Sequence, residues 1–280
     1  MSEYSNPMLN PDFLREIPKT DIHVHLDGSL RVATLIELAI ERNITLPTYD
    51  ADELRKTVFN GGYDSLEDYL NGFQYTVGVM QDAVSVERVA YEFAVDNYSE
   101  GVRYFEVRFA PQLHASITPS DNFNITEVII AVNCGLERAR DEFNQMLVEE
   151  NRQEPYYDYG IIICAMRSIF PGMSRYYDSL FSLYTDAEPE VVVRLASEIL
   201  MKNILKCKST LKVPIVAIDI AGAESGHKAS SHIASFDLAH EYLLNKTVHA
   251  GEGFGPESIS QALRDLHAER IGHGFHMFNE

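Results

Sequence analysis

The sequence contains no tryptophan, only three cysteines and few basic residues. Cys134, Cys164 and Cys207 lie far apart and form no Cys-x-x-Cys pair, which argues against both a disulfide framework and a thiolate zinc site. We therefore expect a reducing compartment. The 23 Lys and Arg against 42 Asp and Glu give a net charge of -19, which disfavours DNA, RNA or another polyanion as partner, because a phosphate backbone needs a basic patch.

Long hydrophobic runs are also missing. No run approaches the roughly 18 apolar residues of a membrane-spanning helix, and the polar stretch Met1–Pro18 has no signal-peptide core. We expect a soluble cytoplasmic protein without a membrane partner, although a processed sequence would look the same. No Gly-x-Gly-x-x-Gly follows the first expected strand, which disfavours a dinucleotide site. None of these features disfavours a small neutral ligand.

Short β-branched runs alternate with longer helical patterns along the whole chain. Strands are expected over Thr20–Leu26, Val102–Phe109, Tyr159–Met166, Val213–Ile220, Thr247–Ala250 and Ile271–His273. Apolar residues recur at helical spacing over Ser85–Ser99, Ile125–Phe143 and Pro189–Ile204. This alternation predicts an α/β fold with a parallel sheet, either a barrel or an open doubly wound sheet. No Pro/Ser-rich linker divides the chain, so residues 1–280 are expected to form a single domain.

Two histidines one residue apart are the most informative feature of the sequence. In the expected first strand, His23 and His25 point to the same face because side chains alternate along a strand. The other face carries Ile22, Val24 and Leu26, which are expected to pack outward. The arrangement suits a metal ion, whereas the plainer interpretation is a polar strand edge with two solvated histidines.

Polar residues also gather where the other strands end. His249 ends a strand and Glu252 follows in a turn, so a third imidazole and a carboxylate come together. Three neutral imidazoles and one open position make a catalytic zinc site, and a carboxylate beside it suits proton transfer. His273 is flanked by glycines, which leaves its ring uncrowded and able to stabilise developing charge. A loop glutamate and a satisfied strand histidine are the plainer alternative.

Five motifs in order resemble the adenosine deaminase family of the metal-dependent amidohydrolase superfamily over essentially the whole chain. They are PKTDIHVHLDGSL, YFEVRFAPQ, VAIDIAGAE, VHAGE and RIGHG. The resemblance implies a (β/α)₈ barrel of the TIM type that holds one Zn²⁺ per chain. It also implies a purine-salvage activity, the hydrolysis of adenosine or 2'-deoxyadenosine to inosine or its deoxy form and ammonia.

The resemblance also implies roles for particular residues. His23, His25 and His249 would be the zinc ligands, and His25 would also face the substrate. Glu252 would protonate purine N1 during attack at C6, and His273 would hold the zinc-bound hydroxide. The backbone N–H of Gly222 would meet N3, and Asp27 would contact the ribose 5'-hydroxyl.

Asp27 favours adenosine over the other substrates of the family. Relatives that act on free adenine tend to carry Glu at this position, and those that act on N6-methyl-AMP carry another residue. A helix N-cap or a turn carboxylate beside Gly28 is the structural alternative for Asp27. Other readings of the whole chain are an adenine or N6-methyl-AMP deaminase, another metal-dependent amidohydrolase, or a purine-binding protein that has lost its chemistry.

The sequence departs from the family pattern after Gly-His-Gly. Two further strands and the Asp pair that ends the last one are absent, so we count six strands where a closed barrel needs eight. The expected fold is therefore an incomplete barrel that lacks its C-terminal portion and the aspartate expected as a fourth ligand. A fragment of a longer product, a short form that folds with a partner, or an incomplete record would each explain this. On this interpretation the 280-residue chain alone binds zinc weakly and turns over slowly or not at all.

Overall fold

The computed structural model describes residues 10–117 and 123–279. Its framework is a six-stranded parallel sheet in the order β1-β2-β3-β4-β5-β6, in which each strand pairs with its neighbours in the sequence. The strands are β1 (Lys19–His25), β2 (Val102–Phe109), β3 (Asp158–Met166), β4 (Ile215–Ala221), β5 (Asn245–Ala250) and β6 (Arg270–His273).

One helix, α1, precedes β1, and the other helices lie in the connections between the strands. The helices are α1 (Pro11–Glu16), α2 (Val32–Glu41), α3 (Ala51–Thr57), α4 (Leu66–Leu70), α5 (Phe73–Val79), α6 (Ala83–Ser99), η2 (Pro111–Leu113), α7 (Ile125–Glu149), α8 (Arg175–Leu183), α9 (Pro189–Ser209), η3 (Ala229–His232), α10 (Ile233–Glu241) and α11 (Pro256–Arg264). Every strand-to-strand connection contains at least one of them, which is the βαβ pattern expected of parallel strands.

The sheet curves so that its first and last strands approach each other. The Arg270 guanidinium on β6 lies 3.4 Å from the carbonyl oxygen of Ile22 on β1. Among the described residues, β1 is hydrogen-bonded to β2 and β6 to β5, with no ladder between β1 and β6. The structure is therefore a nearly closed barrel of six parallel strands, which confirms the predicted incomplete (β/α)₈ architecture and rules out the open doubly wound alternative.

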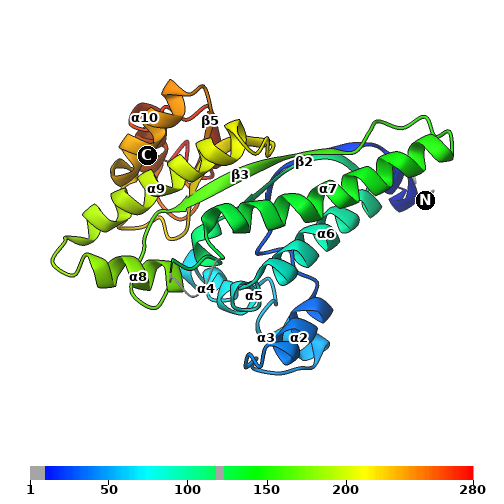
Figure 1. Ribbon diagram of the computed structural model, residues 1–280, viewed down its shortest axis with the longest axis horizontal. Helices are drawn as coiled ribbons and strands as arrows, with labels where there is room; N and C mark the ends of the chain where they lie inside the picture. The colour runs from blue at the N-terminus through cyan, green and yellow to red at the C-terminus, as the bar shows by residue number, and fades with distance from the viewer. Residues whose placement is uncertain (1–9, 118–122, 280) are drawn as a thin grey trace, which may run out of the picture.

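The long helices α6, α7 and α9 cover the outer face of β2 and β3 (Figure 1). Asp82 starts α6 by accepting a hydrogen bond from the Ser85 N–H at 2.8 Å. Three apolar residues then recur on the buried face of this helix, Val86, Val89 and Phe93. The three predicted helices are confirmed, although α7 and α9 extend beyond the predicted ends.

The segment between β1 and β2 holds four helices that the sequence reasoning did not identify. In Figure 1, α2 and α3 lie apart from the sheet, whereas α4 and α5 lie between them and the strands. Side chains from Leu66 on α4 to Val77 on α5 line the main cavity of the molecule. The segment between β1 and β2 therefore forms the roof of the candidate site.

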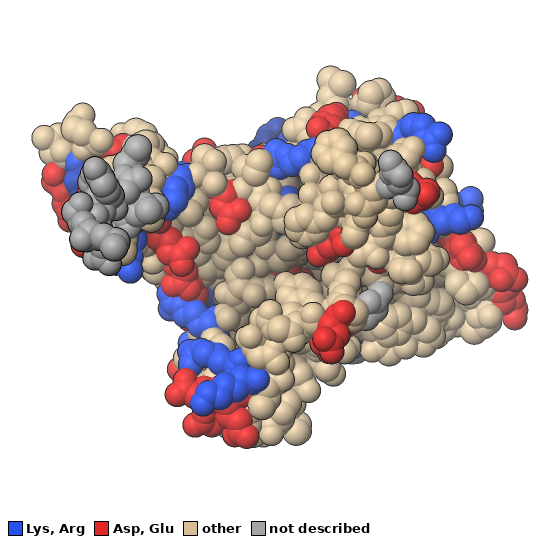
Figure 2. Space-filling view, turned by 180° about the vertical axis from the view of Figure 1, so that it is seen from behind, with Lys and Arg blue, Asp and Glu red and all other residues tan. Residues whose placement is uncertain are grey.

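The described surface carries charges of both signs. Figure 2 shows acidic and basic side chains interspersed on one face, with broad uncharged areas between them. In the described part of the chain, no helix combines the length and the apolar character that crossing a membrane requires.

Candidate active site

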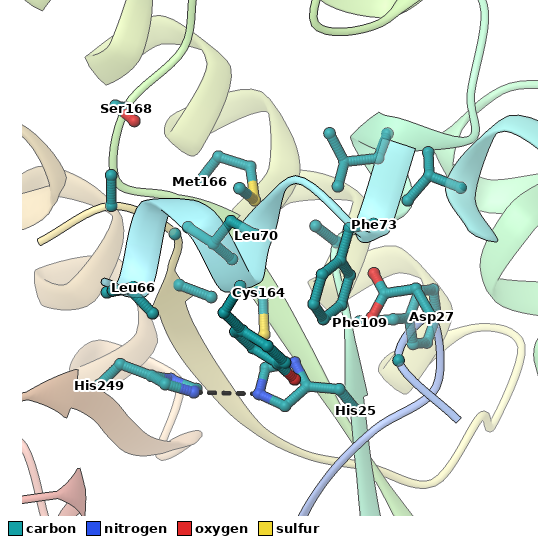
Figure 3. A pocket seen from close by; sticks show the side chains of 18 of the residues that line it. His25, Asp27, Leu66, Leu70, Phe73, Phe109, Cys164, Met166, Ser168 and His249 are labelled. Atoms are coloured by element: carbon teal, nitrogen blue, oxygen red, sulfur yellow. Dashed lines mark hydrogen bonds between the residues drawn. The ribbon is translucent and has the colours of Figure 1, made fainter. Parts of the chain in front are cut away.

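A cavity of about 820 Å³ opens at the carboxyl ends of the strands. Its floor carries His25 and His249, and Cys164 on β3 lies between them and the roof (Figure 3). The roof is apolar, with Leu66, Leu70 and Phe73 above the histidines. A mostly apolar pocket with a few polar groups on one wall is typical of small-molecule sites.

The structure brings together the three histidines that the sequence analysis proposed as metal ligands. The His249 Nε2 atom lies 3.2 Å from His23 Nε2 and 3.0 Å from His25 Nε2. Figure 3 shows the second of these contacts as a dashed line. His273 belongs to the same group, because ring nitrogens of His23, His249 and His273 all lie within 4.8 Å of one another.

Burial keeps two of these rings uncharged. Loss of solvent, followed by the nearby positive charge of Arg108 and the His249 ring, lowers the pKa of His23 to about 3. Loss of solvent and the His249 ring also lower the pKa of His25 well below its usual value. Both imidazoles are therefore neutral at pH 7, the state in which a ring nitrogen can bind a metal.

The histidine spacing around His249 fits a zinc ion. The His23 and His25 rings are farther apart, with centroids separated by 5.8 Å. Two ligands at about 2.0–2.1 Å from a tetrahedral zinc are roughly 3.3 Å apart, close to the 3.0 and 3.2 Å separations at His249. The donor set of three imidazoles matches a catalytic rather than a structural zinc centre. The residues present therefore fit the cation that the sequence analysis expected.

Asp219 is a functional candidate that sequence reasoning missed. Its carboxylate accepts a hydrogen bond from the His249 backbone N–H at 3.1 Å and lies 2.9 Å from His249 Nδ1. Arg108 donates to the same carboxylate at 2.7 Å, and both side chains are fully buried. Burial alone would raise the pKa of Asp219, but His249 and Arg108 lower it to about 2. Asp219 therefore stays ionised and leaves His249 Nε2 facing the cavity, as carboxylates behind metal-binding histidines do.

Glu252 and His273 lie beside the histidine group. The Glu252 carboxylate is 3.4 Å from His273 Nε2, and both side chains are about three-quarters buried, at 23% exposure. Burial raises the pKa of Glu252, and the negative charge of Glu224 raises it further, against the opposing effect of His249. Burial and the neighbouring His249 lower the pKa of His273 to about 4. The arrangement pairs a carboxyl group that holds its proton more readily with a neutral imidazole.

The backbone around His273 is unusual. His273 has a φ of 66°, in the left-handed region that residues with side chains seldom adopt. A Cβ added at Gly272 would lie 2.7 Å from the His23 ring, so only glycine permits this approach of β6 to β1. This agrees with the interpretation that the flanking glycines leave room for an imidazole, and such backbone strain is frequent at functional sites.

Asp27 and Gly222 both line the cavity. Burial raises the pKa of Asp27 to about 7, and its Oδ1 atom has no hydrogen-bond partner in the described structure. Helix α2 begins at Val32 with Arg31 as its N-cap, so Asp27 does not cap it. Gly222 has a φ of 96°, and a Cβ there would lie 2.9 Å from the end of Met166, which explains a glycine at this strand end.

The remaining histidines lie outside this group. His114 and His232 are buried in the core and contact the Met80 carbonyl and the Ser197 hydroxyl through Nδ1, both at 3.0 Å. His276 is partly buried and contacts Asn279. None of these histidines was expected to bind the metal.

Comparisons with known proteins agree with this geometry. The family model described as adenosine deaminase matches residues 18–188 and 189–280. A Streptomyces coelicolor protein called "Adenosine deaminase 1" is 36% identical over 278 residues, covering 97% of this chain and 59% of its own length. Three of the curated relatives that the chain matches are covered over 30%, 59% and 68% of their own lengths, so the chain spans only part of each of them.

Solved structures share the fold. An adenine deaminase from Arthrobacter aurescens has a TM-score of 0.66 and 22% identity, with 94% of this chain and 67% of that chain covered. An amidohydrolase from Burkholderia ambifaria, solved with bound Zn, has a TM-score of 0.69 and 16% identity, with 96% and 62% covered. The family match over nearly all of the sequence, together with the histidine group at the strand ends, shows that the chain belongs to the adenosine deaminase family.

Proposed function

We propose that this chain contributes the metal site and most of the substrate pocket of a deaminase that hydrolyses adenosine or 2'-deoxyadenosine. The products are inosine, or its deoxy form, and ammonia. The observation that carries the proposal is the meeting of His23, His25 and His249 beside Glu252 in one cavity. The family match supports the reaction class, and the apolar roof of the cavity suits a flat purine ring.

His23, His25 and His249 would hold one zinc ion. Bound there, the ion would supply the activated water for attack on purine C6, because zinc lowers the pKa of water to about 7. The Burkholderia relative of the same fold was solved with bound Zn. Asp219, which is paired with Arg108, contacts His249 Nδ1 and so orients the His249 ring before a substrate enters.

Glu252 acts as the general acid. Its raised pKa increases the fraction that still carries a proton near neutral pH. Donation of that proton to ring nitrogen N1 makes C6 more electrophilic, which is what hydrolysis of an aromatic amine requires. His273, uncharged because its pKa is about 4, accepts a hydrogen bond from the attacking water and holds it beside C6.

Asp27 and Gly222 set the substrate's orientation. Asp27 has a buried oxygen without a partner, and a ribose hydroxyl would satisfy it. The backbone N–H of Gly222 would meet purine N3. These contacts favour a nucleoside over a free base, since adenine has no sugar hydroxyl to offer.

The activity is tested by following the absorbance of adenosine with the purified, zinc-loaded 280-residue chain. The 280-residue chain alone is expected to turn over slowly, so the measurement compares substrates. We expect slow conversion of adenosine and 2'-deoxyadenosine, and slower reaction still of adenine and N6-methyl-AMP. Glu252→Gln should lower kcat by roughly 10²- to 10⁴-fold, whereas Glu257→Gln, an exposed neighbour, should not. Faster turnover of adenine or N6-methyl-AMP would replace the substrate assignment. Binding of adenosine without turnover would show a purine-binding homologue instead.

Zinc binding is tested separately from activity. The chain should bind up to one zinc per molecule in an equilibrium titration followed by metal analysis, with the weak affinity expected of the 280-residue chain alone. His249→Ala should abolish stoichiometric binding, because His249 contacts both other ligands. His276→Ala is the matched control and should bind as the unmodified chain does. Equal zinc content in both variants would remove His249 from the ligand set.

A further inference from the structure

The loop after β5 is held by a buried carboxylate from the loop after β4. Glu224 is 5% exposed. Its two oxygens accept hydrogen bonds from four successive backbone N–H groups, those of Gly251 at 2.6 Å, Glu252 at 3.0 Å, Gly253 at 2.7 Å and Phe254 at 3.0 Å. Among the described hydrogen bonds, no other side chain binds so many consecutive backbone groups.

This contact is strong because of its chemistry. An ionised carboxylate has about four acceptor positions over its two oxygens. Here Oε1 accepts one of the four N–H groups and Oε2 accepts three. Hydrogen bonds to a charged acceptor are about twice as strong as neutral ones. The same four donors also compensate for removing the carboxylate from water, which an unpaired charge could not tolerate.

The loop needs such an anchor. Gly251 and Gly253 give the segment high backbone freedom, and Gly251 has a φ of 67°. The following helix α11 begins at Pro256, and its N-cap residue Gly255 provides no side-chain hydrogen bond. The segment after β6 adds one backbone hydrogen bond, from the His276 N–H to the Gly251 carbonyl at 3.2 Å, so Glu224 supplies most of the described hydrogen bonds that order the backbone around Glu252.

Arg167, at the end of β3, makes further hydrogen bonds next to the loop 251–254. Its guanidinium is buried and donates to the carbonyl of His249, just before the loop, and to the carbonyl of His227, just after Glu224. Its positive charge also lies close enough to Glu224 for the two to interact electrostatically. Three consecutive strand ends are thereby joined around one loop.

We propose that Glu224 is a positioning residue, which fixes the loop 251–254 so that the Glu252 side chain faces His273 and the cavity. The proposal rests on the proposed function for its catalytic consequence, but the anchoring itself does not. Glu224 contacts neither a reacting atom nor a metal ligand's ring. It acts through the backbone of the residue that supplies the proton.

A second effect has the same origin. The negative charge of Glu224 adds to burial in raising the pKa of Glu252, so the anchor also favours the protonated acid. A neutral anchor of the same shape would hold the loop less tightly and would lose this contribution as well.

The anchoring is tested by amide hydrogen exchange on the full chain. Glu224→Gln keeps one acceptor oxygen and the side-chain length but removes the charge. We expect the amides of residues 251–254 to exchange roughly tenfold faster or more, because each weakened bond lowers the local opening energy. The amides of β3 should keep their protection, which separates loop release from global unfolding. Glu257→Gln, three residues beyond the loop and exposed, is the matched control. Unchanged exchange at 251–254 in Glu224→Gln would overturn the proposal.

The catalytic consequence is tested with adenosine on the same variants. We expect Glu224→Gln to lower kcat by roughly tenfold or more, because a misplaced catalytic group slows the reacting step, and to change KM by less than about threefold. Glu224→Asp keeps the charge but withdraws it by one methylene, so it should give intermediate exchange and intermediate kcat. A fall in activity that appears only as raised KM would overturn the positioning role. Preferential turnover of adenine or N6-methyl-AMP over adenosine, together with faster loop exchange in Glu224→Gln, would reject the proposed function and leave the anchor standing.

Discussion

The two sides of the candidate site are built in different ways. On the side of β4 and β5, Asp219 and His249 lie on hydrogen-bonded neighbouring strands, and a fully buried Arg108 pairs with Asp219. On the side of β1 and β6, His23 and His273 approach through their rings, with centroids 4.6 Å apart, while their strands share no described ladder. The first side takes its geometry from backbone pairing, whereas the second depends on side-chain contacts.

The difference teaches where the site is rigid. A strand with partners on both edges fixes its side chains through the ladder, and a buried ion pair then permits few alternatives. At the β1–β6 side the connecting contacts are less buried: the side chain of Arg270, which pairs with the buried Glu106, is 39% exposed, and Ile22 is 42% exposed. We therefore expect changes on the β4–β5 side to cost much more stability than matched changes on the β1–β6 side.

The largest expected loss of stability follows from breaking the buried Arg108–Asp219 pair, and the Arg270–Glu106 pair provides the comparison. Arg108→Met leaves the carboxylate of Asp219 buried without its partner and should lower the free energy of unfolding by about 3–5 kcal/mol. Arg270→Met removes a partly exposed pair and should cost less than about 1 kcal/mol. Urea unfolding of both variants provides the measurement. Equal losses would show that the two sides are equally rigid.

Acid should act on the interior through the two core histidines. Burial lowers the pKa of both His114 and His232 to about 4. The unfolded chain takes up a proton near pH 6.5 and the folded chain only near pH 4, so stability falls as the pH falls through this window. The loss should approach roughly 3 kcal/mol per histidine by pH 4.

Variants at two histidines distinguish the effect of the buried imidazoles from a general loss of stability in acid. In urea unfolding between pH 7 and pH 4, His114→Gln should show a shallower dependence than the unmodified chain. His276→Gln, at a partly exposed position after β6, should leave the slope as it is. Parallel slopes for His114→Gln and the unmodified chain would contradict the expected role of burial.

The smallest effect concerns one methyl group on each side. Ile218 on β4 is fully buried, so Ile218→Val should cost about 0.5–1.5 kcal/mol. Ile22 on β1 is 42% exposed, so Ile22→Val should change stability by less than about 0.5 kcal/mol. A larger loss at Ile22 in thermal unfolding would show that this edge is covered in solution.

Much of the framework could be predicted because the strands are β-branched and apolar. All six predicted strands exist, with ends that differ by at most two residues. The expectation that Ile22, Val24 and Leu26 pack outward is only partly confirmed. Leu26 is buried and Val24 packs against the core, but Ile22 is exposed because β1 has a described partner on one edge only.

Other parts of the site could not be predicted from local pattern. Asp219 stands inside the apolar run of β4, and that interruption was its only signal, because its partners Arg108 and His249 are 111 and 30 residues away. In the sequence, Glu224 is an acidic residue in a loop without a distinguishing pattern. Its role depends on the turn after β5, which packs against it in the fold. The roof formed by α4 and α5 consists of short helices with weak periodicity, so packing rather than propensity decides their place.

The order of the strands gives the histidine group a further property. His249 meets His23 and His25 across separations of 226 and 224 residues, so a cation bound by all three joins distant parts of the polypeptide. Binding of the cation therefore closes a very long loop of the chain, and closing such a loop has a large entropy cost in the unfolded state. The cation's affinity should therefore report on completion of the whole fold, and a chelator should weaken the molecule far from the place where the ion is held.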